Sequence, residues 1–143
     1  MYTKQVSVFL ENKKGRLADV TGLLTREGIN IRALCLADTA DFGVLRLIVN
    51  DRQRCLGVLK AHDLAAQETE VLAVEIEDKP GGLHRIVEVL DREGVNIEYM
   101  YTFLEKSGDK AIAVFNSDGA ARAAEVLKKA GIVLVPEDAL QNL

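Results

Sequence analysis

Two short glycine-containing segments carry the groups best suited to hold a small charged molecule. They are residues 11–17, Glu-Asn-Lys-Lys-Gly-Arg-Leu, and residues 77–83, Glu-Asp-Lys-Pro-Gly-Gly-Leu. Each precedes a stretch whose pattern predicts a helix, and the first N–H groups of a helix have no partner inside it. These N–H groups and the positive end of the helix dipole favour a carboxylate, while glycine lets a ligand approach the backbone.

Asparagine residues near these segments suit a ligand that carries both charges. Asn12 lies in the first segment, and Asn30 and Asn96 follow the predicted helices within Gly-Ile-Asn-Ile (28–31) and Gly-Val-Asn-Ile (94–97). An asparagine side chain donates and accepts, so it can meet the carboxylate and the ammonium of a zwitterion. On spacing alone a structural interpretation is favoured, in which the glycines form tight turns and the asparagines cap helices with left-handed geometry.

The histidine and cysteine residues do not indicate catalysis or metal binding. His62 and His84 lie on different predicted helices without a neighbouring ligand pattern, so we expect them to be exposed to solvent. Cys35 and Cys55 form no CxxC pair, which argues against a disulfide framework and a thiolate metal site, and we expect packed thiols. We therefore predict no catalytic residue, no metal and no cofactor.

Composition excludes several classes of partner. The chain has 143 residues and a formal net charge of −4, with basic residues scattered among acidic ones. It therefore offers no extended positive field for nucleic acid. No apolar run approaches the roughly 20 residues needed to span a membrane. We expect a cytoplasmic protein that binds neither nucleic acid nor membranes.

The sequence contains an internal duplication at an offset of 66 residues. Gly15–Ile31 and Gly81–Ile97 are identical at eight of seventeen positions, whereas unrelated sequences would match at roughly one. The two copies comprise residues 1–70 and 71–143, and no Gly, Pro or Ser linker separates them. We therefore expect that the two domains do not tumble independently.

Each copy shows the same order of strand, helix, strand, strand, helix and strand. Apolar residues at helical spacing predict the first helix of each copy, with Gly28 and Gly94 as left-handed caps, and acidic residues favour the start of the second. This order predicts an α+β fold of two tandem ferredoxin-like βαββαβ domains, each an antiparallel four-stranded sheet with both helices on one face. Strands are expected at 5–10, 30–36, 44–49, 66–70, 71–77, 96–104 and 111–115, and second helices at 51–62 and 118–130.

One predicted strand differs between the copies. Tyr99, Tyr101 and Phe103 align with small residues of the first copy, and Met100 lies on the opposite face of the strand. A strand that is apolar on both faces indicates contact with another domain or subunit. Aromatic side chains that fill the domain's own core are an equally good interpretation.

Both copies resemble the ACT family of amino-acid-binding regulatory domains, and the resemblance covers the whole chain. The family signature is a strand that ends in Asn/Asp-x-Pro-Gly-x-Leu, followed after the helix by Gly-Ile/Val-Asn-Ile. Residues 78–83 with 94–97 fit it throughout, whereas the first copy has Lys14 where proline is usual.

The resemblance implies that an amino acid is held between adjacent domains, by the strand-to-helix loop of one and the start of the second strand of its neighbour. Asp78 stands where the first copy has Asn12, and an ionised carboxylate only accepts hydrogen bonds, so we predict two classes of site with different affinity. The candidates that the resemblance implies are Asn12, Gly15, Leu17, Asn30 and Ile31, and Asp78, Gly81, Gly82, Leu83, Asn96 and Ile97.

Three functions stay open at this stage. The first is a regulatory sensor, a homodimer in which the bound amino acid changes the assembly or a partner enzyme, because the two copies leave no segment for catalysis or DNA binding. The second is the regulatory subunit of an amino-acid-biosynthetic enzyme, since Val6–Asn12 is similar to the opening of the acetohydroxyacid synthase small subunit. The third is a structural dimerisation module without a ligand.

Overall fold

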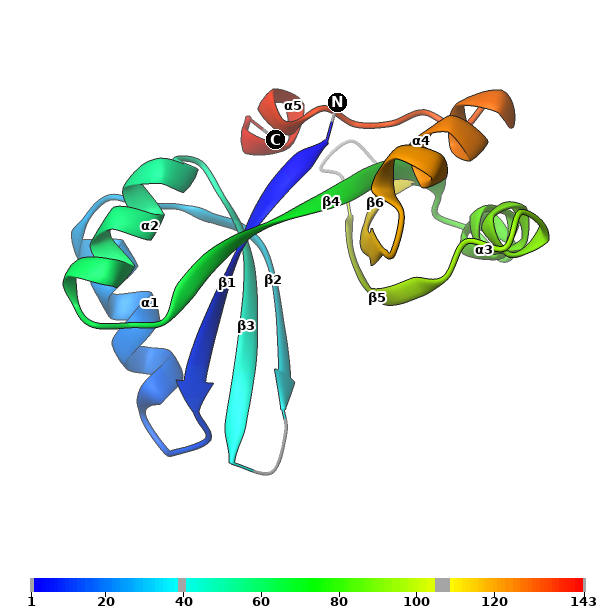
Figure 1. The fold of residues 1–143 in the computed structure, drawn as a ribbon. Helices are drawn as coiled ribbons and strands as arrows, with labels where there is room; N and C mark the ends of the chain where they lie inside the picture. The colour runs from blue at the N-terminus through cyan, green and yellow to red at the C-terminus, as the bar shows by residue number, and fades with distance from the viewer. Residues whose placement is uncertain (1, 39–40, 105–108, 143) are drawn as a thin grey trace. The chain divides into compact units, whose positions relative to one another are not determined.

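The computed structural model describes residues 2–38, 41–104 and 109–142, and it divides the chain into two compact units. The first unit comprises residues 4–69, and the second comprises residues 70–141 together with Tyr2 and Thr3. Figure 1 shows that each unit combines twisted strands with helices. One long strand, β4 (Ala66–Glu77), contributes residues to both units without a break.

In the first unit, two helices cover one face of the strands, as predicted (Figure 1). The strands lie in the order β2-β3-β1-β4, and β1 and β2 each pair with β3 in antiparallel fashion. The elements are β1 (Thr3–Glu11), α1 (Arg16–Arg26), β2 (Ile31–Asp38), β3 (Phe42–Val49), α2 (Arg52–Ala61) and the beginning of β4.

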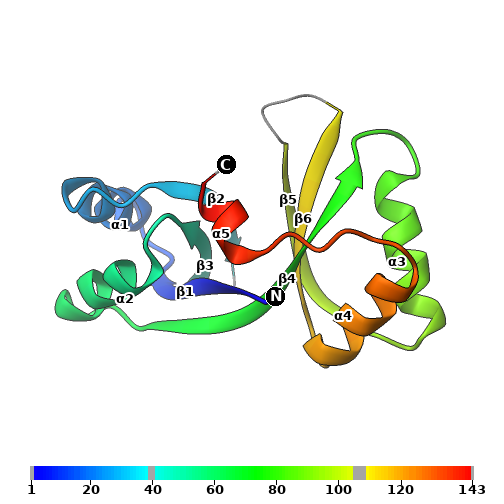
Figure 2. The same cartoon turned by 90° about the horizontal axis from the view of Figure 1, so that it is seen from above.

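The second unit repeats this arrangement with the strand order β4-β6-β5, and β6 pairs with both neighbours in antiparallel fashion. Figure 2 shows α3 and α4 on the same face of these strands. The elements are the end of β4, α3 (Gly82–Arg92), β5 (Ile97–Leu104), β6 (Lys110–Ser117), α4 (Ala120–Lys129) and the short α5 (Glu137–Gln141).

The apolar spacing that predicts the first helix of each copy also marks its buried face. In α1, Val20, Leu23 and Leu24 are buried against the sheet, and in α3 the buried residues are Ile86 and Leu90. Each row packs against alternate residues of its own strands because side chains of a strand point in turn to opposite faces. In the first unit these strand residues are Val6, Val8, Leu10, Leu45, Leu47 and Val49, and in the second they are Leu72, Val74, Ile76, Ala111, Ala113 and Phe115.

The helix boundaries follow most of the predicted signals. Gly28 and Gly94 have left-handed backbones, with φ of 71° and 69°. Asp51 caps α2, because its side-chain Oδ1 accepts a hydrogen bond from the N–H of Arg54 at 3.1 Å. In α4 the cap position is occupied by Gly119, which makes no side-chain cap, and Asp118, the acidic residue predicted near this helix start, lies one residue before it.

The closing strand of the second copy is reduced to a single bridge. Leu134 faces Val74 in an isolated antiparallel bridge, and Val135 donates its N–H to the carbonyl oxygen of Ala73 at 2.8 Å. Pro136 comes next and has no N–H to donate, so the pairing stops there. The chain then forms α5, an element that the sequence pattern did not predict.

The aromatic residues of β5 point away from the helices of their own unit. Tyr101 pairs with Val114 and Phe103 with Ile112, and these strand positions alternate with the ones that pack under α3 and α4. Met100 lies on the helix side and packs against that core. Tyr101 is only 8% exposed, whereas Tyr99 and Phe103 are partly buried, so this second face of the strand is covered in part. The aromatic side chains therefore do not fill the helix-side core, which was one of the two interpretations.

Candidate functional site

The first strand-to-helix loop is held by its own backbone. Asn12 donates its N–H to the carbonyl oxygen of Asp41 at 2.9 Å, and Arg16 donates to the carbonyl oxygen of Lys13 at 3.2 Å. Gly15 is the N-cap of α1 with φ of 90°, a left-handed conformation that residues with a Cβ rarely adopt. Its carbonyl oxygen accepts the N–H of Asp19 at 2.9 Å, which starts the helix. Gly15 has no side chain that could cap the helix, so the cap residue offers only backbone groups at the N-terminal end of α1.

The second loop has the equivalent hydrogen bonds and the same left-handed glycine despite its different sequence. Asp78 donates its N–H to the carbonyl oxygen of Asp109 at 2.8 Å, and Gly81 caps α3 with φ of 89° and without a side-chain cap. The carbonyl oxygen of Gly81 accepts the N–H of Arg85 at 3.1 Å. Lys14 of the first loop and Pro80 of the second are therefore compatible with one and the same turn.

The first helical position distinguishes the loops. Gly82 begins α3, and a Cβ at this residue would lie 2.0 Å from the carbonyl oxygen of Glu77. Real Cβ atoms do not come that close to backbone oxygen, so the second loop requires glycine there for steric reasons. The first loop has Arg16 at the same position and accommodates its side chain.

Each loop carries an exposed ion pair at its base. Nζ of Lys13 lies 2.9 Å from the carboxylate of Glu11, and Nζ of Lys79 lies 2.6 Å from that of Glu77. The hydrogen bond and charge of Lys13, with a smaller effect of Arg16, lower the pKa of Glu11. Lys79 lowers the pKa of Glu77 in the same way, and its own pKa is raised by that carboxylate.

Leucine follows the start of the helix in both units and stays accessible. Leu17 is 38% exposed and Leu83 is 40% exposed, although the helix positions one turn further along are buried. Ile31 and Ile97 differ, because each packs in part against the core of its own unit. Of the four predicted apolar site residues, only the two leucines thus lie mainly outside the cores.

In the first unit, the asparagine that follows the first helix forms hydrogen bonds through its backbone. The N–H of Asn30 donates to the side-chain Oδ1 of Asn50 at 2.9 Å, and the N–H of Asn50 returns a bond to the carbonyl oxygen of Asn30 at 3.1 Å. Asn30 and Asn96 are exposed, and neither has the left-handed backbone that the capping interpretation requires. That structural interpretation of the two asparagines is therefore wrong.

Within one unit the residues of the predicted loop lie far from the predicted asparagine. Gly15 lies at the start of α1 and Asn30 follows its end, and a helix of 11 residues is about 16 Å long. Gly81 and Asn96 are separated in the same way by α3, which also has 11 residues. A ligand that contacts a loop and an asparagine must therefore be held by more than one domain.

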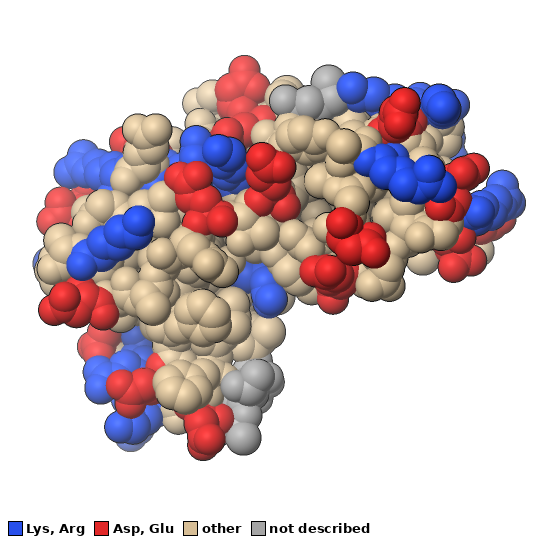
Figure 3. Space-filling view, in the orientation of Figure 1, with Lys and Arg blue, Asp and Glu red and all other residues tan. Residues whose placement is uncertain are grey.

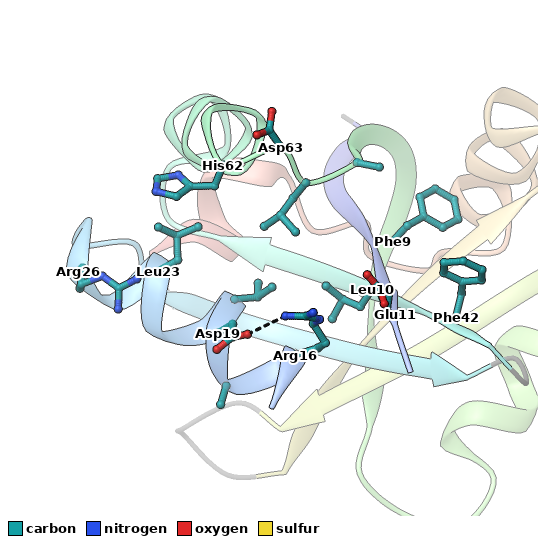
Figure 4. Close-up of a pocket in the computed structure, with 14 residues that line it drawn as sticks. Phe9, Leu10, Glu11, Arg16, Asp19, Leu23, Arg26, Phe42, His62 and Asp63 are labelled. Atoms are coloured by element: carbon teal, nitrogen blue, oxygen red, sulfur yellow. Dashed lines mark hydrogen bonds and ion pairs between the residues drawn. The ribbon is translucent and has the colours of Figure 1, made fainter. Parts of the chain in front are cut away.

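A cavity that the sequence did not predict adjoins the first loop. It has a volume of about 670 Å³ and is lined by the end of β1, one face of α1, the start of β3 and the turn between α2 and β4 (Figure 4). The second unit has a corresponding cavity of about 460 Å³. The signal in the sequence is the stripe Arg16, Asp19, Leu23 and Arg26, which recurs every three or four residues and so shares one helix face.

The remaining titratable groups do not form a reactive centre in the described residues. His62 and His84 are exposed, as predicted, and His62 places its Nδ1 3.0 Å from the carbonyl oxygen of Val58. Burial raises the pKa of the Cys55 thiol to about 11, which disfavours the reactive thiolate. Among the residues that the structure describes, no group of three His, Cys, Asp or Glu side chains is placed to hold a metal ion.

The surface charges are mixed. Figure 3 shows Lys and Arg side chains interspersed with Asp and Glu over the visible face. In the part of the chain that the structure describes, no helix is long and apolar enough to cross a membrane.

Comparison with known protein families identifies the family of this chain. The family model described as an ACT domain pair matches residues 1–143, and the chain belongs to this family. No curated protein matches the sequence significantly.

Solved structures agree with this assignment. The chain is similar to protein BT0572 from Bacteroides thetaiotaomicron, with 40% identity, a TM-score of 0.94, and coverage of 100% of this chain and 98% of that one. It also resembles the ligand-free regulatory subunit of aspartate kinase from Thermus thermophilus, at 16% identity and a TM-score of 0.62, covering 89% and 91% of the two chains. The corresponding subunit from Thermus flavus gives 17% identity and a TM-score of 0.61, with 90% and 92% covered.

Proposed function

We propose that this protein is a non-catalytic, cytoplasmic regulator that binds an amino acid and passes the signal on through a partner enzyme or a change of assembly. The observation that carries the proposal is that both units of an ACT domain pair start their first helix from the same left-handed glycine. Gly15 and Gly81 have φ of 90° and 89°, and both helix starts lack a side-chain cap. Uncapped N–H groups at a fixed helix end suit a carboxylate ligand.

The ligand is held between domains in this proposal. Its carboxylate meets the loop and helix start of one domain, and its ammonium meets the exposed side chain of Asn30 or Asn96 of a neighbour. The separation of loop and asparagine along α1 and α3 supports this arrangement, because one domain alone cannot supply both. A ligand bound across such an interface favours the arrangement of domains for which it has the higher affinity, and a homodimer provides the required neighbours.

The output is proposed to run through an enzyme of amino-acid metabolism. The regulatory subunits of aspartate kinase have a similar fold over most of both chains, and they are regulatory chains by name. At 16% and 17% identity this likeness concerns the fold, so the partner enzyme has to be found by experiment. A pull-down from native lysate with the tagged full chain tests it, and a stoichiometric metabolic enzyme is the expected result.

A thermal-shift screen with the twenty proteinogenic amino acids tests ligand binding itself. A ligand at 100 times its Kd stabilises a protein by about 2.7 kcal/mol, so one or a few amino acids are expected to raise the Tm by several degrees. Asn30→Ala and Asn96→Ala should each reduce the shift and leave the Tm of the free protein unchanged. Unchanged affinity in both variants contradicts the site assignment, and indifference to all twenty compounds favours a structural module without a ligand.

A further inference from the structure

One wall of the cavity of the first unit carries an ion pair. Arg16 and Asp19 project from the first turn of α1 and form an ion pair, with Nη1 and Oδ2 3.2 Å apart. Figure 4 shows this pair between Leu23 on one side and Leu10 on the other. An adjacent guanidinium and carboxylate are complementary to an adjacent carboxylate and ammonium, which is the charge pattern of an amino acid. The two side chains are 47% and 68% exposed, so a ligand can reach them.

The rest of the cavity combines apolar side chains with polar ones, namely Glu11, Arg26, His62 and Asp63. Leu10, Val20 and Leu23 line it and are buried, with exposed fractions of 5%, 2% and 6%. At one end lie the rings of Phe9 and Phe42, side by side in Figure 4 and about half exposed. Side chains of a strand point in turn to opposite faces, so the ring of Phe9 lies on the other side of β1 from Leu10. An apolar ligand side chain between Leu10 and Leu23 would be removed from water, with the rings at the edge of the cavity.

The second unit provides an internal control, because it has the same backbone frame. Phe9 donates its N–H to the carbonyl oxygen of Ala65 at 3.0 Å, and Glu75 donates to that of Val133 at 3.1 Å. The two cavities thus lie between the same strand and the same closing segment of their units. The volume of the second one is smaller by about a third, at about 460 Å³ against 670 Å³.

The side chains of the second cavity lack both features. Lys110 faces Glu77 across the strands as Phe42 faces Glu11, so Lys110 takes the position of Phe42. Glu75 takes the position of Phe9, and it forms an ion pair with Lys110. Gly82 and Arg85 replace the pair of arginine and aspartate on the helix. The second cavity therefore has neither an aromatic end nor a carboxylate on its helix wall.

We propose that the cavity of the first unit binds an amino acid with a large apolar side chain, and that the second unit has no such site. The ligand opens the ion pair, placing its carboxylate against Arg16 and its ammonium against Asp19, with its side chain between Leu10 and Leu23. This proposal rests on the proposed function in that the signal is an amino acid, but it places a site inside one domain instead of between domains.

Titration calorimetry of the full-length protein with L-leucine and L-phenylalanine tests this site. Asp19→Asn removes the charge that meets the ammonium at nearly constant shape, and it is expected to weaken binding at least tenfold. Arg85→Gln in the second unit is the matched control and should leave the affinity within twofold. The double variant Phe9→Glu, Phe42→Lys imports the ion pair of the second unit at exposed positions and should also weaken binding at least tenfold.

The outcomes separate the two proposals. Binding of either amino acid that resists both cavity variants and is lost in Asn30→Ala overturns the cavity site and leaves the proposed function intact. Absence of heat with these two compounds, together with a thermal response to a different amino acid, also overturns the cavity site alone. Backbone amide shifts in a ¹⁵N NMR titration with L-leucine must include residues 62–65, on the wall opposite α1, and shifts confined to residues 78–83 contradict the site.

Discussion

The two strand-to-helix loops share their hydrogen bonds and their left-handed glycine but differ in their surroundings. Gly15 and Gly81 adopt the same left-handed conformation, and equivalent hydrogen bonds tie each loop to the start of the neighbouring strand. Beside the first loop lies a cavity lined by two phenylalanines and by the ion pair of Arg16 and Asp19. Beside the second loop lies a smaller cavity, in which the ion pair of Lys110 and Glu75 takes the place of the phenylalanines. The backbone of a duplicated domain thus indicates the family, whereas the side chains around it must be examined copy by copy to infer binding.

The largest effect is expected at Gly82, the first residue of α3. Gly82→Ala should destabilise the protein by at least about 2 kcal/mol, because its Cβ would lie 2.0 Å from the carbonyl oxygen of Glu77. In an ordinary helix, alanine in place of glycine stabilises by up to about 1 kcal/mol. Urea unfolding monitored by circular dichroism measures the difference.

Arg16→Ala is the matched variant in the first unit. It removes an exposed ion pair and should change the free energy of unfolding by less than about 1 kcal/mol. Equal effects of the two substitutions would contradict the steric difference between the loops.

The next effect should be the same in both units. Gly15→Ala and Gly81→Ala each force a Cβ into the left-handed region, at a cost of roughly 1–2 kcal/mol. Neither Cβ would meet another atom within 4 Å, so the cost is one of backbone conformation alone. Chemical denaturation of both variants should give values within about 0.5 kcal/mol of each other. A clear difference between the two losses of unfolding free energy would show that the two turns are not equivalent.

A smaller effect is expected at the second helix of each unit. Asp51→Ala removes the cap of α2 and should destabilise the protein by about 1 kcal/mol. The second unit has Gly119 at this position, with an extended backbone that accepts other residues. Gly119→Asp should therefore stabilise by a few tenths of a kcal/mol, measured as a change in Tm. A loss of stability in this variant would contradict the capping comparison.

The smallest effect concerns the ion pairs at the base of the loops. The pKa values of Glu11 and Glu77 are lowered in the folded protein, so their contribution to stability is present above the unfolded value of 4.5 and is lost as pH falls through the lowered pKa. The pKa of Lys79 is raised, so its contribution is present below 10.5 and is lost as pH rises through the raised pKa.

Side-chain NMR titration checks these pairs. Lys13→Met and Lys79→Met should each move the pKa of the adjacent glutamate back towards its ordinary value. A small residual shift is expected at both carboxyls, because Arg16 also lowers the pKa of Glu11, and Arg85 and Lys110 also lower that of Glu77. Identical titration curves for the wild-type protein and both variants would exclude these contacts in solution.

Features that depend on local spacing are predictable from this sequence. The row Val20, Leu23 and Leu24 specifies both the helix and its buried face, because an amphipathic helix repeats every 3.6 residues. The repeated Arg-Glu-Gly before each second strand marks the left-handed glycine that ends the helix. Because each pattern occurs in both copies, the assignment in one copy supports the assignment in the other.

Features that depend on the meeting of distant segments are not predictable in this way. The cavity of the first unit combines β1, α1, the start of β3 and the turn before β4, and no single pattern places them together. The steric need for glycine at residue 82 comes from the carbonyl oxygen of Glu77, which only the folded turn brings near.

The most direct test of the account is calorimetric titration of the full-length protein with the amino acid that raises its Tm. Because the two units differ at residues 12 and 78 and in the adjoining cavities, we predict two classes of site, the tighter one in the first unit. Asp78→Asn gives the second loop the asparagine of the first, so it should reduce the difference in affinity between the two classes of site. A single class of identical sites in the wild-type protein, or no heat with any of the twenty amino acids, would contradict it.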